Sequence, residues 1–412
     1  MSDRPEAQGA LEPGGPAKKK PAGAGRSRLF REITGVGLDW RSALLVPLLA
    51  IITALFVSAV IIAVTDIDAL RLWGSDPGQA ASLTFGTIRD AFGGLFQGAF
   101  GSWSAWSETL LMATPLILAG LAVAIGFRAG LFNIGVEGQM IIGGLLATIV
   151  GFSFHLPVWI HLPLALLGGL VGGALYAGIA GLLRAKTGAH EVITTIMLNW
   201  ISYRFLDWAL TVDFIQAQGR EDSISKDVLP TAMLTRFLPH DPRIRLHIGI
   251  ILALLAAGFA FWLLYRTTIG YQFRAVGYNP NGAHYAGMNV TWLYVLVMAV
   301  SGAMAGLAGA TQILGPLGRA TPGFSAGIGF SAIALALLGR SHPVGVVFAG
   351  LLFGALQAGG RQMQVASNVS IDLIQVVQAL IVVFIAAPAL IRAIYRVRTG
   401  KGAERITKGW AA

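Results

Sequence analysis

The sequence predicts an all-α, polytopic membrane protein with about ten transmembrane helices and both termini in the cytoplasm. Its 412 residues are 55% hydrophobic and only 12% charged, about half of the roughly 25% charge that is usual in soluble domains. Nearly uncharged stretches of about 20 residues recur along the chain, and this is the length that an α-helix needs to cross a bilayer. The ten-residue alternation of a membrane β-barrel is not visible.

Basic residues are concentrated at the two ends of the chain. Residues 1–41 contain eight of the 30 Lys and Arg residues, and residues 392–412 contain six. This is the positive-inside pattern of membrane proteins, and it argues against a nucleic-acid partner. We expect 1–41 to be a disordered cytoplasmic tail rather than a signal peptide, and 396–412 to be a second basic tail. Lys18–Lys20 could act as a topology signal or bind anionic headgroups.

The membrane domain is expected over residues 42–395. Ten spans are predicted within it, at 42–64, 108–127, 136–154, 158–183, 192–212, 247–265, 291–314, 326–339, 343–358 and 372–391. With both tails inside, the connections 65–106 and 213–246 lie outside the cytoplasm and 267–290 lies inside. The segment 326–339 is short for a full crossing, and a half-helix or a re-entrant piece is the alternative.

Small residues recur at every fourth position in three of the predicted spans. The stripes are Gly169, Gly173, Ala177 and Gly181; Gly302, Gly306 and Ala310; and Gly350, Gly354 and Ala358. Small residues allow helix backbones to approach closely in lipid. The stripes are consistent with a tight static bundle or with a sliding interface.

Polar residues are rare within the apolar stretches, so each one is a candidate for function. Asn133, Glu137 and Gln139 are expected in a capped, hydrogen-bonded turn at the cytoplasmic end of the third span. The alternatives for them are a gate or solute contact and a proton carrier. In the fifth span, Asn199 lies near Arg204 and Asp207.

Arg204 and Asp207 are three residues apart and can pair on one face of a helix. They are interpreted as an ion pair near the outer interface or as part of a translocation path.

The sequence offers no constellation for catalysis. It has no cysteine, its histidines are scattered without metal-ligand spacing, and the phosphate loop G-x-x-x-x-G-K-[ST] is absent. We therefore expect a chain that is not an enzyme and that holds no metal or cofactor.

The connection 267–290 is too polar to span the membrane and contains signals for one short helix. Asn279 can cap the helix and Pro280 fits its first position, where the missing N–H costs nothing. Gly287 can end it in a left-handed conformation. The predicted helix, 280–286, is either an ordinary connector or a helix that docks into a partner.

Three motifs together resemble permease subunits of ATP-binding-cassette (ABC) importers, in the nucleoside and simple-sugar group related to branched-chain amino acid permeases. They are GLFNIGVEGQ (130–139), RAVGYNPNGAHYAG (274–287) and GFSAIALALLGRSHPVG (329–345). The resemblance covers roughly 106–395. It implies a multi-pass protein of the bacterial cytoplasmic (inner) membrane that works with a second permease subunit, cytoplasmic ATP-binding subunits and an extracytoplasmic solute-binding protein.

The resemblance also implies that the region 279–287 is a coupling helix seated in an ATP-binding subunit. The residues expected at this contact are Arg274, Asn279, Pro280, Ala283, Tyr285, Ala286 and Gly287. Nucleosides are the leading solutes, with sugars or branched-chain amino acids as alternatives. Outside this family, the alternatives are an ion-coupled secondary transporter and, more remotely, a lipid-modifying membrane enzyme.

Overall fold

The computed structural model describes residues 40–367, 369–370, 372–387 and 394–395. The chain divides into two units, 1–43 and 44–412, and the fold described here is that of the second. The tails predicted at 1–41 and 396–412 lie almost entirely outside the described residues.

The helices are α2 (Trp40–Thr65), α3 (Ile67–Leu72), α4 (Pro77–Phe100), α5 (Trp103–Arg128), α6 (Val136–Ser153), α7 (Val158–Thr187), α8 (Glu191–Ala209), η1 (Pro230–Ala232), α9 (Gly249–Arg266), α10 (Thr268–Tyr278), α11 (Pro280–Tyr285), α12 (Val290–Gln312), η2 (Ile313–Leu317), α13 (Ile328–Leu338), α14 (Pro343–Ser367) and α15 (Asp372–Ala386).

Helices account for every regular element in the described part of the chain, which confirms the all-α class. Each predicted span coincides with a helix. Seven of the helices, α2, α5, α6, α7, α9, α12 and α14, are long and apolar enough to cross a membrane. The shorter α13 and α15 and the more polar α8 fall outside that set, so the count of ten spans stays a prediction.

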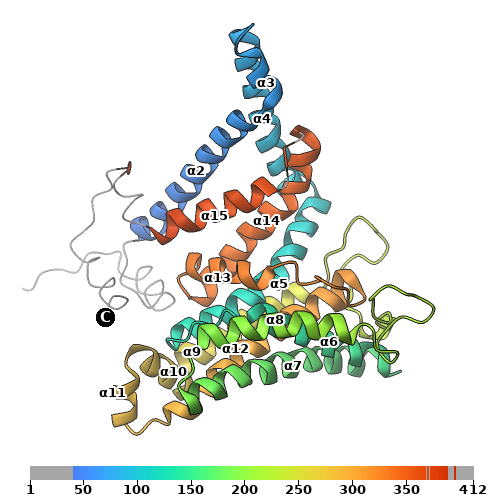
Figure 1. Ribbon diagram of the computed structural model, residues 1–412, viewed down its shortest axis with the longest axis vertical. Coiled ribbons are helices and arrows are strands. Elements are labelled where there is room, and N and C mark those ends of the chain that lie inside the picture. Colours follow the sequence, from blue (N-terminus) through green and yellow to red (C-terminus); the bar gives the residue numbers. More distant parts are fainter. Residues whose placement is uncertain (1–39, 368, 371, 388–393, 396–412) are drawn as a thin grey trace, which may run out of the picture. The chain divides into compact units, whose positions relative to one another are not determined.

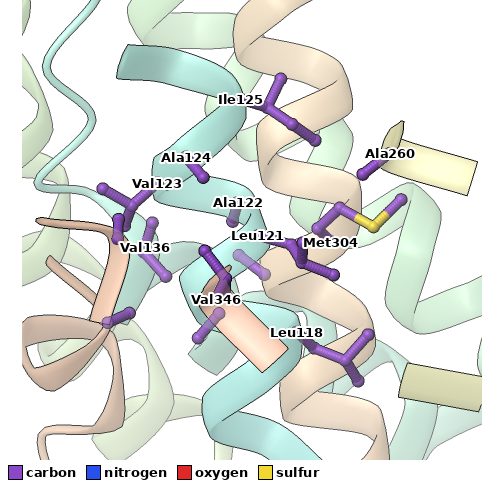
Figure 2. Packing of buried hydrophobic residues seen from close by; sticks show 14 of the residues in the cluster. Leu118, Leu121, Ala122, Val123, Ala124, Ile125, Val136, Ala260, Met304 and Val346 are labelled. Atoms are coloured by element: carbon purple, nitrogen blue, oxygen red, sulfur yellow. The ribbon is translucent and has the colours of Figure 1, made fainter. Parts of the chain in front are cut away.

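Helix α5 is the centre of the packing. Its residues from Ala113 to Gly126 are all buried, and α6, α9, α12, α13 and α14 contact it. Figure 2 shows Leu118, Leu121 and Ile125 of α5 among side chains of these neighbours, including Met304 of α12. A helix that is apolar on all sides must be surrounded, and here it is surrounded by protein rather than by lipid.

Two of the predicted stripes of small residues pack against each other. Gly173 of α7 meets Gly302 and Gly306 of α12, and a methyl group on Gly173, Gly302 or Gly306 would overlap the facing backbone. A methyl group on Gly169 would overlap the side chain of Ala310. These two helices share the most extensive contact in the fold. The third stripe, through Gly350 and Gly354 on α14, faces α5. The stripes are therefore helix–helix interfaces.

The predicted connection 65–106 is largely helical. The side chain of Asp76 caps α4, and Pro77 occupies the first position of the helix, which is a helix-start signal visible in the sequence. A methyl group on Gly98 would overlap the Gln362 side chain of α14 and lie 3.0 Å from Gly359 Cα, so the two helices also lie close together there.

The helix bundle has two distinct ends, shown in Figure 1 by the positions of α11 and of the long loop between α8 and α9. At what we call the α11 end, the α5–α6 turn contacts α10 through Gly130 and Gly277. At what we call the η1 end, the loop 210–248 bonds to α6 and to the segment after α12, for example Leu234 N–H to Leu314 O at 2.7 Å.

Candidate functional site

The segment that contains Asn133 begins by turning back into the bundle. The N–H of Leu131 donates to Gly126 O at 3.0 Å, so the chain returns beside α5 before α6 starts. The amide of Asn133 donates to Ser301 Oγ at 2.8 Å, and Ser301 lies in the middle of α12. The sequence predicts this turn at the cytoplasmic end of the third span. In the structure, residues 131–135 run inward after α5, so α6 begins beside the middle of α12, and the role of the turn stays a prediction.

Asn133 and Gln139 form a closed pair of side-chain amides. The Asn133 amide donates to Gln139 Oε1, and the Gln139 amide donates to Asn133 Oδ1, each at 2.9 Å. The N–H of Gly135 also donates to Asn133 Oδ1, at 3.0 Å. Both side chains are buried, and burying amides in this way is tolerated only when they are hydrogen-bonded.

The carboxylate of Glu137 is fully buried and accepts four hydrogen bonds. Oε1 accepts from the Ser325 hydroxyl at 2.5 Å, from the Tyr203 hydroxyl at 3.1 Å and from Gly327 N–H at 3.2 Å. Oε2 accepts from Gly329 N–H at 2.7 Å. The carboxylate thus lies at the N-terminus of α13, where unpaired N–H groups and the helix dipole favour a negative charge.

Asn199 of α8 completes this cluster. Its Oδ1 accepts from Gly138 N–H at 2.8 Å, and its amide donates to Ile134 O at 2.9 Å. The cluster links α6, α8, α12 and α13. We call it the central polar network, and its members are Asn133, Glu137, Gln139, Asn199, Tyr203, Ser301 and Ser325.

Arg204 and Asp207 lie outside the central polar network. Their side chains pair at 3.4 Å along α8, as predicted, and both are largely exposed. An exposed pair of this kind adds little stability.

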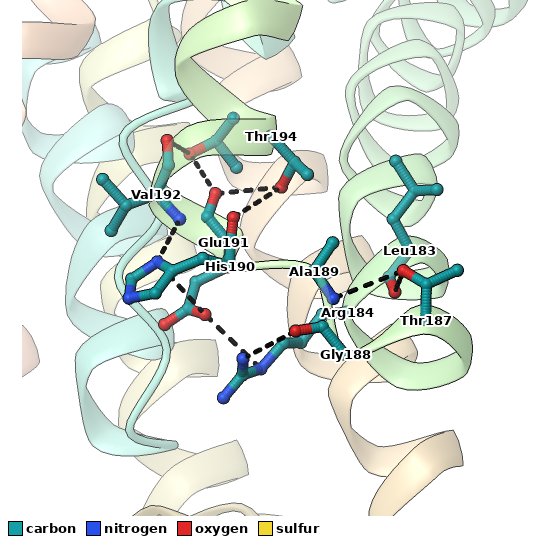
Figure 3. A network of polar contacts seen from close by, with 10 residues as sticks. Leu183, Arg184, Thr187, Gly188, Ala189, His190, Glu191, Val192 and Thr194 are labelled. Atoms are coloured by element: carbon teal, nitrogen blue, oxygen red, sulfur yellow. Dashed lines mark hydrogen bonds and ion pairs between the residues drawn. The ribbon is translucent and has the colours of Figure 1, made fainter.

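A second polar cluster secures the connection between α7 and α8. Arg184 pairs with Glu191 at 3.4 Å, and Gly188 ends α7 with a φ of +70°. Figure 3 shows these groups with His190, whose ring nitrogen accepts from Val192 N–H. This cluster was not predicted, although the Gly after a basic final turn is a helix-end signal.

The predicted short helix at the α11 end is present. Asn279 Oδ1 accepts from Gly282 N–H at 2.9 Å, Pro280 is the first helical residue, and Gly287 has a φ of +80°. Ala283 is buried against the bundle, whereas Tyr285 is 90% exposed. The preceding helix α10, capped by Thr267, was not predicted, because its sequence alternates polar and apolar residues without a long apolar stretch.

Helix α10 is fixed to the bundle by two contacts. A methyl group on Gly277 would overlap the backbone of Arg128, Ala129 and Gly130. The guanidinium of Arg274 lies 5.3 Å from the centre of the Tyr265 ring, so this predicted docking residue packs at least partly against its own chain. The α5–α6 turn is therefore a direct neighbour of α10.

Arg128 also holds the link between α13 and α14. Its guanidinium donates to Ser341 O at 2.8 Å and to Arg340 O at 3.2 Å. Arg340 and Ser341 have φ values of 53° and 50°, a conformation that costs energy for residues other than glycine. The motif 329–345 thus contains a strained link whose carbonyls are bound by the end of α5.

At the η1 end, a bidentate ion pair ties the long loop to α5. Arg245 donates to both carboxylate oxygens of Glu108, at 2.7 and 2.6 Å, and Arg361 lies 3.9 Å away. The bond to Glu108 raises the pKa of Arg245. This pair was not predicted, since its members are 137 positions apart.

No group of three or more His, Asp or Glu side chains suited to a metal ion occurs in the part of the chain that the structure describes. The polar groups near the bundle centre bind one another and backbone, so the central polar network is an internal bracing of four helices.

Comparisons with known proteins agree with the motifs. Residues 106–386 match the family described as branched-chain amino acid transport system, permease component. The chain is 38% identical over 365 residues to a guanosine ABC transporter permease of Bacillus subtilis, covering 88% of this chain and 99% of that protein. It is 34% identical over 345 residues to a glucose ABC transporter permease of Haloferax volcanii (82% and 86%). A nucleoside ABC transporter permease of Lactococcus lactis is 33% identical over 353 residues (84% and 92%).

The family match extends over more than half of the chain, and the similarity to the relatives is nearly full-length. Permeases of ABC transporters work with ATP-binding subunits and a substrate-binding protein, which accounts for a chain that lacks a phosphate loop. The chain therefore belongs to the branched-chain amino acid transport system permease family, and it is a multi-pass ABC transporter permease of the cytoplasmic membrane rather than an enzyme.

Proposed function

We propose that this permease carries nucleosides into the cell in an ATP-driven importer. The observation that carries the proposal is the similarity to the guanosine permease, which extends over 99% of that relative. The nucleoside permease of Lactococcus lactis supports the same solute class. The glucose permease is nearly as similar, so a sugar is the second candidate.

The proposal is tested by reconstituting the complete complex in proteoliposomes. Radiolabelled guanosine, uridine and glucose are supplied with the binding protein, and ATP is enclosed on the side of the ATP-binding subunits. We expect nucleoside uptake that requires ATP. Uptake of glucose alone would replace nucleosides with sugars, and robust uptake by the purified chain under a proton or sodium gradient would contradict the ABC mechanism.

We further propose that α11 is the helix that docks into an ATP-binding subunit. It is short, capped by Asn279 and exposed at Tyr285 and Ala286, while Ala283 attaches it to the bundle. Exposed aromatic side chains are frequent anchors of protein interfaces. The contact with α10 and the α5–α6 turn provides a path from this helix to the bundle.

The docking role predicts that a bulky charge on the exposed surface at the end of α11 uncouples the complex. Ala286→Arg places a bulky charge at an exposed position, and it should lower transport and substrate-stimulated ATP hydrolysis at least tenfold while the permease still inserts into the membrane. Asn281→Arg introduces the same charge at another exposed position of this helix. Comparing its transport with that of Ala286→Arg shows how much of the loss is due to the charge alone. Normal transport and ATPase stimulation in Ala286→Arg would mean that the docking surface lies elsewhere.

The importer also requires a second permease chain beside this one, either a second copy or a related subunit. Purifying tagged and untagged copies together from one cell distinguishes the two arrangements. Recovery of the untagged copy supports a homodimer, and recovery of a different permease supports a heterodimer.

A further inference from the structure

Two adjoining recesses in the described part of the bundle have aromatic walls and no assigned role, and Trp200 lines both. One, of about 480 Å³, is formed by α8 alone and includes Trp208. The other has a volume of about 410 Å³ and is lined by Ile196, Asn199, Trp200, Tyr203 and Phe330. Four of these residues come from α8 and one from α13. The volume is within the range of roughly 300–1,000 Å³ that is usual for sites of small molecules.

The walls and the floor of this recess differ in chemistry. Trp200 is 60% exposed and Phe330 is 45% exposed, so both rings have accessible surface. Asn199 is buried beneath them, and the Tyr203 hydroxyl donates to Glu137. The recess therefore lies directly over the central polar network and is held in shape by it.

The recess lies beside a helix that begins inside the bundle. Helix α13 has 11 residues and is about 16 Å long at 1.5 Å per residue, roughly half of a bilayer core. The segment before it is not helical and includes Ala326 and Gly327 with positive φ values. Non-helical backbone at membrane depth is tolerated only within protein or beside a polar cavity, and short interrupted helices are pointers to transport sites.

The charge at the recess favours an uncharged solute. The N-terminus of α13 would attract an anion, but the Glu137 carboxylate already accepts from Gly327 and Gly329 N–H. A phosphate or carboxylate on the solute would meet a like charge there and find these two donors occupied.

We propose that this recess is a contact site for the base of a nucleoside during transport, with the base stacked on Trp200 and Phe330. The inference rests on the proposed nucleoside function and assigns it a place in the chain. Aromatic side chains stack on any base, which suits a permease that accepts several nucleosides. Because the solute has to move on, a site built on stacking without a charged clamp is appropriate.

A matched pair of tryptophans tests the proposal. Trp200 and Trp208 lie on the same helix and are both 60% exposed, but only Trp200 lines the recess. In the reconstituted complex, Trp200→Ala and Phe330→Ala should lower kcat/KM for nucleoside uptake about tenfold or more. Trp208→Ala should stay within twofold of the parent, and Trp200→Phe should keep most of the activity.

Uptake by the parent complex distinguishes a failure of the proposed nucleoside function from a failure of the recess as a contact site. A parent that transports no nucleoside contradicts the proposed function. If the parent transports nucleosides but Trp200→Ala and Trp208→Ala are equally active or equally impaired, the proposed function holds and only the role of the recess is contradicted.

The absence of cysteine from the sequence permits a direct probe of occupancy. In Ile196→Cys, which lines the recess and leaves both stacking rings in place, labelling by a water-soluble maleimide should be slowed by guanosine in the turning-over complex and unaffected by glucose. Labelling of Trp208→Cys should not respond to either. Equal protection at both positions, or labelling of Ile196→Cys only by a reagent dissolved in the membrane, would overturn the proposal.

Discussion

Glu137 shows how a buried charge is accommodated at the level of one residue. Its carboxylate accepts four hydrogen bonds at mid-height of the bundle. A buried donor or acceptor left without a partner costs about 1–3 kcal/mol, so the side chain at this position contributes strongly to the joint between α6 and α13.

Two substitutions of Glu137 should differ in their effect. Glu137→Gln keeps the oxygen that accepts from Ser325 and Tyr203, but it turns an NH₂ toward Gly329 N–H, so transport should fall and remain measurable. Glu137→Leu leaves all four donors unpaired and should abolish transport. Uptake and thermal stability of the purified protein measure both effects. Complete loss in Glu137→Gln with normal assembly, together with uptake driven by a pH gradient in the parent, would instead support a proton carrier.

His247 at the η1 end predicts a dependence of stability on pH. Burial, with a smaller effect of Arg236, lowers its pKa to about 4, and its neutral Nδ1 accepts from Gly249 N–H at 3.1 Å. The unfolded chain binds a proton below pH of about 6.5, so the folded state loses up to about 3 kcal/mol as the pH falls from there toward 4.

Melting temperatures between pH 7.5 and 4.5 test this dependence. The decrease toward acid pH should be smaller in His247→Gln than in the parent. His240→Gln, at an exposed position, should behave as the parent does, and equal slopes in all three proteins would exclude His247 as the cause.

At the scale of the elements, the sequence predicted helices well and their partners poorly. The spans could be predicted from the length of their apolar stretches. Helix α11 could be predicted from Asn279, Pro280 and Gly287, because helix caps and turns depend on neighbouring residues in the sequence. Three of the four partners of Glu137 are 188 to 192 positions away, just before α13 and in its first turn, and Tyr203 is 66 positions away on α8. No local pattern contains that information. The inward course of residues 131–135 was missed for the same reason, since it depends on contacts with α5 and α12.

The contact between α10 and the α5–α6 turn should be necessary for coupling. A methyl group on Gly277 would overlap backbone atoms of residues 128–130, which cannot move aside as a flexible side chain can. Gly277→Ala should therefore displace α10 and lower the amount of solute transported per ATP hydrolysed. Gly258→Ala on α9 has open space around it and serves as the control. Equal coupling ratios in the two variants would show that this contact does not transmit motion.

At the scale of the whole bundle, the two ends determine which side of the membrane each connection faces. Arg128 joins the α13–α14 link to the α5–α6 turn, beside α10 and α11. At the η1 end, Ser225 N–H donates to Ala320 O at 3.0 Å and Val228 N–H donates to Gly318 O at 2.9 Å. Residues 318–338 therefore pass from the η1 end to the α11 end, half as irregular chain and half as α13.

The path of residues 318–338 from one end of the bundle to the other predicts that this segment crosses the membrane completely. The number of spans is then even, and the C-terminal tail lies in the cytoplasm. Because the chain has no cysteine, single cysteines can report on each side in sealed, right-side-out vesicles. Glu221→Cys in the outer loop should react with an impermeant maleimide directly. His284→Cys on α11 and Arg340→Cys in the α13–α14 link, all three at exposed positions, should react only after the membrane is permeabilised. Direct labelling of Arg340→Cys alone would mean that α13 is re-entrant and returns to the outer side, which would place the C-terminal tail on the opposite side from α11.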